Sequence, residues 1–476
     1  MANTLVGVLE SGQPRVGILA EARREYAELH FAAGKVGVTL INLNMRAVAE
    51  ELAPLLEEAD PGLVLFSDTT APIADALREL SPGRQWIRFG QGRGGFEEFI
   101  TGAATVDPQL DVDAESIHSV VFTSGSTGTP KGVLISHRAA VARGAEKAAA
   151  LGLTGNDGYV MNVPMFHIGG DVPLYASTLI GARFGILPNV EAAPMFELIA
   201  EHGLTTLTFP PAGQVLMGYI DHLRAQGSPG TSLRAAEGQG DPIPPDVLSE
   251  LTGRLHIPYR DSYGMSEVST VLGRWVGPGQ VPTYRKDPFI LAALELVDDR
   301  GVVIDAATVD VVGELVVRSP MVTSGYLNQP EATVQAMASG WFRTGDLFHR
   351  DDAGAYRFTE RKSYVIRSGG ENVYPAEIER VLKAAPGVAE VIVVGMDDRT
   401  YGRVPKAFIV PNASGTTTVA KVEAFARQHL AGLKRPKVWE FVTAADIPRT
   451  PLGKVLRKEL ERRKPVGQAP DEPNSD

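Results

Sequence analysis

The sequence contains no cysteine among its 476 residues. Disulfide bonds, thiolate metal ligands and a cysteine nucleophile are therefore excluded, so any thiol in a reaction of this protein has to come from a substrate. No run approaches the roughly 18 uncharged apolar residues of a membrane-spanning helix. The N-terminal Met1-Ala-Asn-Thr-Leu-Val6 lacks the basic segment and long apolar core of a secretory signal. We therefore expect a cytoplasmic protein without a transmembrane segment.

Positive charge is also scarce, since 57 acidic residues outnumber 46 basic ones and the formal net charge is −11. This balance argues against a general binder of nucleic acid or anionic membranes, so a phosphate ligand has to be held by a local site. The length exceeds what one hydrophobic core usually supports, which predicts two or more domains. The content of 44% hydrophobic and 22% charged residues is ordinary for a globular protein.

The N-terminal part alternates between strand-like and helix-like segments. Strands are predicted at 15–19, 37–42 and 63–66, with amphipathic helices at 21–33 and 47–59. Further along the chain, an alanine-rich helix is predicted at 137–151, with Ser136 as its N-cap. Such alternation predicts a parallel sheet flanked by helices.

The most informative stretch is a loop rich in glycine and hydroxyl groups, Thr123-Ser-Gly-Ser-Thr-Gly-Thr-Pro-Lys-Gly-Val133, between strand-like runs at 119–122 and 133–135. Its glycines let several backbone N–H groups converge on one point, while the hydroxyls and Lys131 add donors for an anion. A polyphosphate fits this description. The loop is not the nucleoside triphosphatase pattern, because Pro130 takes the place of its second glycine. A flexible linker is the alternative, but Pro130 and the β-branched flanks argue against it.

Three further motifs follow in order: Asn162-Val-Pro-Met-Phe-His-Ile-Gly-Gly170, Gly238-Gln-Gly-Asp-Pro242 and Asp261-Ser-Tyr-Gly-Met-Ser-Glu267. In the last, Tyr263 offers an aromatic face, Asp261 an acceptor, Ser266 a hydroxyl and Glu267 a hard oxygen ligand for Mg²⁺. Taken alone, the first motif is as readily a core histidine, and the second fails the dinucleotide fingerprint because Ile243 replaces its third glycine.

The C-terminal part contains Trp341-Phe-Arg-Thr-Gly-Asp346, Glu360-Arg-Lys-Ser-Tyr364, Ser368-Gly-Gly370 and a Pro/Gly turn that precedes Lys454. Arg361 carries a planar and permanently charged fork of donors, which suits ribose and phosphate oxygens. An aspartate that only closes a turn and a surface lysine are the ordinary alternatives for Asp346 and Lys454.

In this order, the motifs resemble those of the adenylate-forming (AMP-binding) superfamily, which includes acyl-CoA ligases, peptide-synthetase adenylation domains and luciferases. The resemblance implies an α/β fold with a large N-terminal domain, residues 1–361, of parallel sheets flanked by helices plus a small β-subdomain. This domain is shortened at its N-terminus relative to the family. A small mobile α+β domain, residues 362–464, and a disordered tail, residues 465–476, are expected to follow.

The resemblance also assigns roles to individual residues. It implies that nucleotide is bound by Thr123, Ser124, Gly125, Ser126, Thr127, Gly128, Thr129, Lys131, Gly238, Gln239, Gly240, Asp261, Ser262, Tyr263, Gly264, Met265, Ser266, Asp346, Arg361 and Lys454. It implies catalytic roles for Lys454, Glu267, Ser266 and Arg361, and metal ligation by Glu267 and Thr127. It implies an acyl pocket at His167, Gly170, Phe209 and Gly264. It implies a CoA tunnel at Ser368, Gly369 and Gly370 and a hinge at Ser363.

The sequence departs from the family pattern at Glu360, where glycine is usual, at Ser363 in the hinge and at Tyr364, where aspartate is usual. These changes leave open how well the C-terminal domain rotates for a thioester step. Ser266 replaces the usual threonine and keeps its hydroxyl.

The implied reaction is ATP-dependent activation of a carboxylic acid as an acyl-adenylate with release of pyrophosphate, followed by transfer to the thiol of CoA. The substrates would be a small carboxylic acid, ATP with Mg²⁺, and CoA.

An enzyme that loads a carrier-protein phosphopantetheine, or that stops after adenylation, is the first alternative. A nucleotide-binding regulatory protein without catalysis is the second, against which the intact Lys454, Glu267 and Arg361 argue. An esterase is disfavoured because no Gly-x-Ser-x-Gly elbow is present. The sequence does not identify the carboxylic acid, and it leaves open whether the protein forms a homodimer.

Overall fold

The computed structural model describes residues 1–10, 12, 14–90, 94–123, 130–210, 213–227, 232–238, 243–369, 371–412, 417–430, 432–449 and 455–463. Several sequence predictions lie outside the described residues, namely those for Ser124, Gly125, Ser126, Thr127, Gly128, Thr129, Gln239, Gly240, Gly370, Lys454 and the tail 465–476.

The chain forms two compact units. The first comprises Met1–Glu295, Val316–Thr344 and Ala353–Tyr356, and the second comprises Leu296–Leu315, Gly345–Asp352 and Arg357–Asp476. Segments 296–315 and 345–352 thus associate with the C-terminal part of the chain, although both precede residue 361. The domain boundary between residues 361 and 362 stays a prediction.

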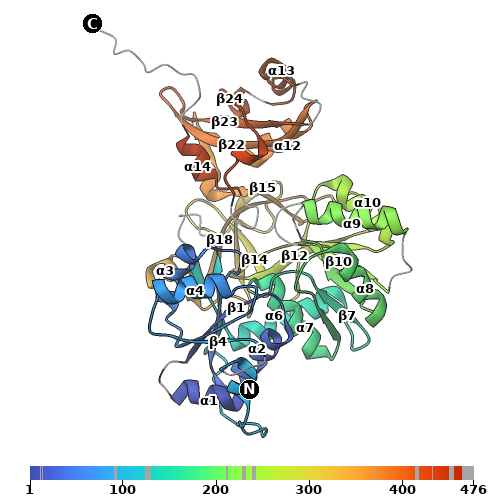
Figure 1. Ribbon diagram of the computed structural model, residues 1–476. Helices are drawn as coiled ribbons and strands as arrows, with labels where there is room; N and C mark the ends of the chain where they lie inside the picture. The colour runs from blue at the N-terminus through green and yellow to red at the C-terminus, as the bar shows by residue number, and fades with distance from the viewer. Residues whose placement is uncertain are drawn as a thin grey trace. The chain divides into compact units, whose positions relative to one another are not determined.

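The first sheet of unit 1 has the strand order β16-β6-β5-β2-β1-β3-β4 (Figure 1). Strands β1 to β5 pair in parallel, whereas β6 is antiparallel to β5, and β16 is antiparallel to β6. The strands are β1 (Arg15–Leu19), β2 (Thr39–Asn42), β3 (Leu63–Phe66), β4 (Gln85–Arg88), β5 (Ile117–Thr123), β6 (Lys131–Ser136) and β16 (Gly325–Tyr326). The connecting helices are α1 (Ala2–Glu10), α2 (Arg24–Val36), α3 (Ala49–Ala59), α4 (Ala71–Leu80) and α5 (Phe96–Ile100). The predicted parallel α/β arrangement is confirmed.

The second sheet has the order β13-β12-β11-β10-β9-β7-β8, with helices α8, α9 and α10 beside it (Figure 1). Its strands are β7 (Gly158–Met161), β8 (Arg183–Ile186), β9 (Thr206–Thr208), β10 (Ala235–Gly238), β11 (Tyr259–Met265), β12 (Ser269–Val276) and β13 (Asp287–Pro288). The helices in this part of the chain are α6 (His137–Leu151), α7 (Ile168–Ile180), α8 (Ala192–His202), α9 (Gly213–Gln226) and α10 (Pro245–Leu255).

Two smaller sheets follow in the described chain. One has the order β14-β15-β18-β17, with β19 paired to β18. Its strands are β14 (Ala293–Val297), β15 (Val311–Arg318), β17 (Met337–Ala338), β18 (Trp341–Arg350) and β19 (Tyr356–Arg361). The other has the order β21-β20-β23-β22, with β24 paired to β23. It contains β20 (Ile366–Ser368), β21 (Glu371–Val373), β22 (Val388–Asp398), β23 (Gly402–Pro411) and β24 (Val438–Phe441). The remaining helices are α11 (Pro330–Ala336), α12 (Pro375–Lys383), α13 (Val419–His429) and α14 (Arg457–Arg462).

Local side-chain chemistry sets the ends of the first helices. Helix α6 has the predicted Ser136 cap, whose hydroxyl accepts a bond from the Ala139 N–H at 3.2 Å. Helix α2 begins at Arg24, three residues later than predicted, because Arg23 stays extended. The Arg23 guanidinium pairs with Glu21 and Glu25 on either side of it, which holds this residue outside the helix.

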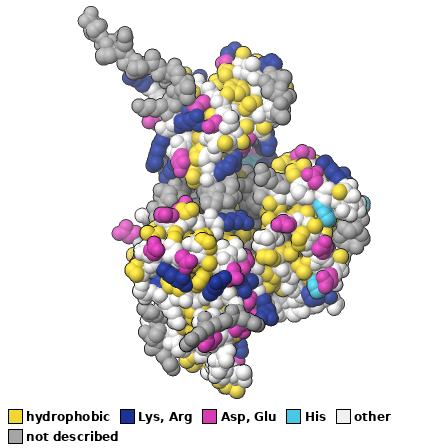
Figure 2. All heavy atoms as spheres, viewed as in Figure 1, with side chains coloured by type: hydrophobic (Ala, Val, Ile, Leu, Met, Phe, Trp, Pro, Cys, Tyr) yellow, Lys and Arg dark blue, Asp and Glu magenta, His cyan; other side chains and the backbone are white. Residues whose placement is uncertain are grey.

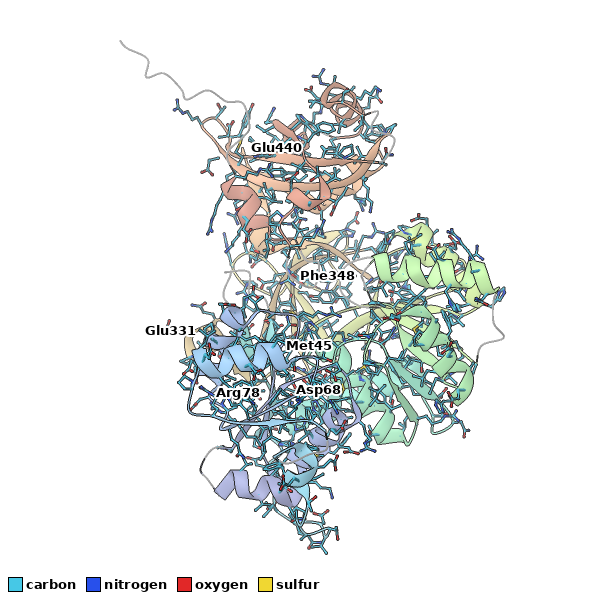
Figure 3. All side chains as sticks on the ribbon, viewed as in Figure 1. Met45, Asp68, Arg78, Glu331, Phe348 and Glu440 are labelled. Atoms are coloured by element: carbon cyan, nitrogen blue, oxygen red, sulfur yellow. The ribbon has the colours of Figure 1, made fainter. Side chains whose placement is uncertain are left out.

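Aromatic and charged side chains cover the outer end of the first sheet. The Arg78 guanidinium of α4 lies 4.8 Å from the centroid of Phe66 and 5.5 Å from that of Trp86, a cation–π arrangement (Figure 3). Nearby, Asp68 forms an ion pair with Arg88. Basic and acidic side chains are interspersed over the face drawn in Figure 2. No helix in the described part of the chain has the length and apolarity needed to cross a bilayer.

Helices α6 and α7 pack closely because α6 has a glycine at their contact. A Cβ atom on Gly144 would lie 2.8 Å from the Tyr175 Cβ and 3.0 Å from the Ala176 backbone nitrogen. Gly218 in α9 is a useful contrast, since a Cβ there would meet nothing within 4 Å.

We predict opposite effects of alanine at these two helical glycines. Gly144→Ala should lower the free energy of unfolding by about 1–3 kcal/mol through overpacking. Gly218→Ala should raise it by about 0.5–1 kcal/mol, because alanine has the higher helix propensity. Thermal unfolding followed by circular dichroism checks both. Equal shifts in the two variants would contradict the close α6–α7 packing.

Candidate active site

Strands β5 and β6 bring the two ends of the predicted phosphate loop together. Thr123 and Lys131 are register partners in the antiparallel pair, and the Thr123 hydroxyl donates to the Lys131 carbonyl at 3.5 Å. The Lys131 Nζ atom lies 4.7 Å from the centroid of the Tyr326 ring. The first and last predicted phosphate ligands therefore lie at one edge of the sheet, beside an aromatic ring that sequence reasoning did not select.

Glu267 lies in the turn between β11 and β12, and its side chain is buried at 8% exposure. The Tyr326 hydroxyl donates to Glu267 Oε1 at 3.1 Å. The Glu267 carbonyl accepts from the Thr323 N–H at 2.7 Å and from Arg143 Nη2 at 3.3 Å. Both the backbone and the carboxylate of this predicted metal ligand are thus held by defined donors.

The same turn explains Gly264 in structural terms. The β11–β12 register shifts between Tyr263 and Gly264, and Ser269 on the facing strand has a φ of +60°. A Cβ atom on Gly264 would lie 2.3 Å from the Ser269 carbonyl oxygen. Glycine is therefore required by the close approach of the two strands, and its acyl-pocket role stays a prediction.

The predicted adenine elements lie on neighbouring strands. Gly238, at the end of β10, is the register partner of Asp261 on β11. The Asp261 carboxylate forms a largely buried ion pair with Lys286. Next to it, the Ser262 hydroxyl is buried without a hydrogen-bond partner in the described part of the chain. Lys286 was not anticipated, because a single lysine in an irregular Pro-containing segment carries no pattern.

The predicted ribose ligands lie together in unit 2. Arg361 Nε is 2.9 Å from Asp346 Oδ1 in an ion pair whose aspartate is only 1% exposed. Arg361 itself is about one-third exposed, at 33%. The pair has the acceptor and donors that ribose hydroxyls need, and this role remains a prediction.

The residues that depart from the family pattern near the hinge have structural partners within unit 2. Glu360 accepts from the Ala376 N–H at the start of α12 at 2.7 Å, and burial raises the pKa of its carboxyl group. The Tyr364 ring lies 5.3 Å from the Arg457 guanidinium, which forms a bidentate pair with Glu379. These contacts connect the altered segment to the C-terminal sheet and helices.

The remaining hinge and CoA residues are also in unit 2. Ser363 is exposed in a 3₁₀ turn, Lys362–Tyr364. Ser368 is buried at the end of β20, and its hydroxyl has no hydrogen-bond partner among the described residues. Gly369 has a φ of +57° and donates its N–H to the Tyr401 carbonyl at 2.9 Å. Only Gly369 among these has the positive φ that favours glycine.

The predicted acyl-pocket residues differ in their surroundings. His167 precedes α7 and is half-buried, and its buried Nε2 atom has no hydrogen-bond partner in the described chain. Burial and, to a smaller extent, the positive charge of Arg46 lower the pKa of His167 to about 4, so its ring is neutral near pH 7. A Cβ on Gly170 would lie 2.4 Å from the Pro164 carbonyl. Phe209 packs in the core of the second sheet, with its ring 5.8 Å from that of Tyr259.

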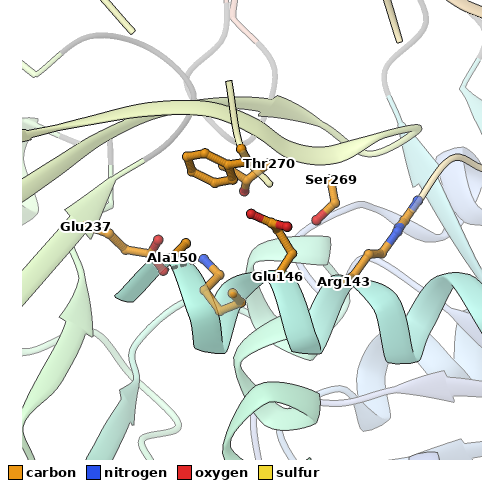
Figure 4. Close-up of a pocket in the computed structure, with 8 residues that line it drawn as sticks. Arg143, Glu146, Ala150, Glu237, Ser269 and Thr270 are labelled. Carbon is orange, nitrogen blue, oxygen red and sulfur yellow. Dashed lines mark hydrogen bonds and ion pairs between the residues drawn. The ribbon is translucent and has the colours of Figure 1, made fainter. Parts of the chain in front are cut away.

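A buried ion pair supports the strand end that leads to Gly238. Lys147 of α6 pairs with Glu237 Oε1 (Figure 4), and both side chains are 3% exposed. The Tyr159 hydroxyl donates to the same oxygen at 2.7 Å. A cavity of about 10 Å³ adjoins this pair, lined by Arg143, Glu146, Lys147, Ala150, Glu237, Ser269, Thr270 and Phe289. It has room for about one water molecule, so it is a structural void rather than a substrate site.

Truncating one partner of this pair should be strongly destabilising. Lys147→Met leaves the Glu237 charge buried without its cation and should lower the free energy of unfolding by about 3–5 kcal/mol. The double variant Lys147→Met/Glu237→Gln should recover most of that loss. Urea denaturation of the two single variants and the double variant measures the coupling. Additive effects would show that the pair is not coupled.

Asp171 in α7 is a second buried charge centre. Burial raises the pKa of its carboxyl group to about 7, despite the opposing charge of Arg143 and backbone hydrogen bonds at the start of the helix. His30 and His118, which contact the Tyr175 hydroxyl of the same helix, have pKa values lowered by burial, to about 3 for His30. The carboxyl group of Asp171 therefore binds its proton more tightly in the folded state than in the unfolded state.

This shift predicts a pH-dependent effect of Asp171→Asn. A raised folded pKa contributes stability below about pH 4 that is lost as the pH rises through 7. Asparagine does not titrate, so the variant does not lose this stability. Its free energy of unfolding relative to the wild type should therefore rise by about 2 kcal/mol between pH 5 and 7. Urea denaturation at both pH values, with Asp111→Asn on the surface as control, measures the difference. The same difference in the free energy of unfolding between Asp171→Asn and the wild type at both pH values would contradict the raised pKa of Asp171.

Comparison with known proteins agrees with the motif order. The family model of the AMP-binding enzyme matches residues 1–327, and that of the AMP-binding enzyme C-terminal domain matches residues 377–454. This protein belongs to the AMP-binding enzyme family. A 2-succinylbenzoate–CoA ligase of Bacillus cereus (strain Q1) is 32% identical over 96% of this chain and 90% of its own.

Two further relatives extend the comparison. The long-chain-fatty-acid–CoA ligase FadD13 of Mycobacterium tuberculosis (strain CDC 1551 / Oshkosh) is 29% identical over 94% of this chain and 88% of its own. The solved O-succinylbenzoate coenzyme A synthetase (MenE) from Bacillus subtilis, in complex with ATP and a magnesium ion, has a TM-score of 0.80. It is 26% identical and covers 96% of this chain and 92% of that one. The mixed α/β fold with a larger N-terminal and a smaller C-terminal part is therefore that of AMP-forming acyl-CoA ligases.

Proposed function

We propose that this protein is an AMP-forming acid–thiol ligase, which activates a carboxylic acid with ATP and transfers the acyl group to CoA. One observation in the site carries the proposal. Lys131, at the end of the phosphate loop, and Glu267, a hard oxygen ligand, both contact the same Tyr326 side chain. A cation and a carboxylate held by one side chain suit a nucleotide that arrives with its metal ion.

The chemistry explains why fixed donors matter more than a general base. A carboxylate has no usable leaving group until its oxygen attacks the α-phosphorus of ATP and releases pyrophosphate. The resulting acyl-adenylate can expel AMP. Because negative charge collects on the oxygens around the α-phosphorus, preorganised cations and hydrogen-bond donors lower the barrier. We assign this charge stabilisation to Lys131, Lys454 and the Ser266 hydroxyl, and the holding of the ribose to Asp346 and Arg361.

The described residues fit a nucleotide-borne magnesium ion. Mg²⁺ is usually held by one or two carboxylates together with substrate phosphates and water, rather than by a cage of protein ligands. Glu267 supplies one such carboxylate, and Thr127 is its proposed partner. No group of three or more histidine, aspartate or glutamate side chains in the described ranges is arranged to hold a metal. The ion, when bound, would neutralise phosphate charge.

The second step requires an external thiol, because the chain has no cysteine. We propose CoA as the acceptor, with Ser368, Gly369 and Gly370 lining its approach after a rotation at Ser363. The exposed 3₁₀ turn around Ser363 supports that assignment. A carrier-protein phosphopantetheine is the other thiol with the same chemistry.

Pyrophosphate release tests the proposal. Purified protein is incubated with ATP, Mg²⁺ and a panel of aromatic, alicyclic, fatty and polyketide-like acids, each with and without CoA. We expect acid-dependent pyrophosphate and a CoA thioester of the same acid. Release of pyrophosphate together with a thioester that forms only on a carrier protein would show that the acceptor is the carrier protein and not CoA. Tight ATP binding without pyrophosphate release for any acid would contradict the proposal.

A further inference from the structure

Tyr326 is held in place by its neighbours before any ligand binds. Its strand β16 pairs antiparallel with β6, where Tyr326 is the register partner of Val133. The Tyr326 N–H donates to the Thr333 hydroxyl at 2.9 Å. The preceding Gly325 has a φ of +123°, and a Cβ there would lie 2.5 Å from Thr333 Cγ2. The backbone of this tyrosine is therefore fixed from both sides.

The tyrosine side chain has two separate contacts. Its ring face receives the Lys131 ammonium at 4.7 Å, and its hydroxyl donates to Glu267 Oε1 at 3.1 Å. Tyr326 is only 9% exposed and Glu267 only 8%. Low exposure strengthens both a cation–π contact and a hydrogen bond to a carboxylate. One rigid side chain therefore orients a cation and an anion from different parts of the sequence.

We propose that Tyr326 is a positioning residue, which uses its hydroxyl to orient Glu267 toward the metal ion of metal-bound ATP and its ring to hold Lys131 beside the phosphates. Tyr326 itself is neither a metal ligand nor a catalytic residue. This inference rests on the proposed function. It adds a residue that no sequence motif assigned to the nucleotide site, and it separates two contributions that ring and hydroxyl make independently.

Two substitutions separate the contributions. Tyr326→Phe removes the hydroxyl and keeps the ring, whereas Tyr326→Leu removes both. The matched control is Tyr26→Phe, which removes a fully buried hydroxyl that donates to Asn42 Oδ1 at 2.8 Å in the same unit. Thermal unfolding of each variant establishes that it is folded. Because Tyr326→Phe preserves the ring packing, it keeps the test valid even if Tyr326→Leu fails to fold.

Two affinities are measured for each variant. The first is the affinity of the enzyme–ATP complex for Mn²⁺, detected by electron paramagnetic resonance of the free ion. The second is the affinity of the protein for ATP in the absence of metal. Loss of a hydrogen bond to a charged group should weaken Mn²⁺ binding by about tenfold in Tyr326→Phe, with metal-free ATP binding unchanged. Tyr326→Leu should in addition weaken metal-free ATP binding by about threefold. Tyr26→Phe should match the wild type in both assays.

The outcomes distinguish this inference from the function on which it rests. Wild-type Mn²⁺ affinity in a folded Tyr326→Phe protein would overturn the positioning role and leave the ligase proposal intact. Loss of metal-free ATP binding in Tyr326→Phe would also overturn it, because the ring alone should maintain Lys131. Failure of the wild type to bind Mn²⁺ with ATP would overturn both.

Discussion

The arrangement of the nucleotide site depends on one buried guanidinium group. Arg143 is the largest fully buried side chain among the described residues, with 1% exposure. Its Nε donates to the Met321 carbonyl at 2.9 Å and its Nη2 to the Glu267 carbonyl at 3.3 Å. Burial lowers the pKa of Arg143 to about 10, so the group remains charged near neutral pH. A buried charge needs such partners, so α6 becomes tied to the turn that carries Glu267 and to the segment before β16.

This connection accounts for the rigidity that the proposed chemistry requires. Adenylation is accelerated by donors and cations that are in place before charge develops on the oxygens of the α-phosphate. Glu267 is held through its carbonyl by Arg143 and Thr323, and through its carboxylate by Tyr326. Lys131 is held by the β5–β6 pairing and by the same tyrosine. Glu267 and Lys131 therefore need little reorganisation when a nucleotide binds.

The strands and helices that depend on a local sequence pattern were predictable from the sequence. The apolar run at 63–66 matches β3 residue for residue, and the Ser136 cap with its alanine-rich run matches α6. Motif order predicted the family. The structure places Thr123 beside Lys131, Gly238 beside Asp261, and Asp346 beside Arg361, and their shared role at the nucleotide stays a prediction. The predictions of β3 and α6 succeed because strand periodicity and helix caps act within a few residues.

Long-range side-chain partners were not predictable in the same way. The Arg143–Met321 bond joins residues 178 positions apart, and Lys147–Glu237 joins residues 90 apart. Neither arginine nor lysine in an alanine-rich helix differs in sequence from a solvent-exposed residue. Phe209 packs in the core of the second sheet, and its role in the acyl pocket stays a prediction, since spacing along a strand does not reveal pocket depth. The contacts of Glu360 with Ala376 and of Tyr364 with Arg457 were not predictable from the sequence either.

The most direct test of the account is exchange of labelled pyrophosphate into ATP, measured without CoA for an acid that supports turnover. Exchange reports the reversible formation of the acyl-adenylate alone, before any thiol or domain motion is needed. The account predicts exchange that requires both the acid and Mg²⁺. Thioester formation without any acid-dependent exchange, or formation of ADP and phosphate in place of AMP and pyrophosphate, would contradict it.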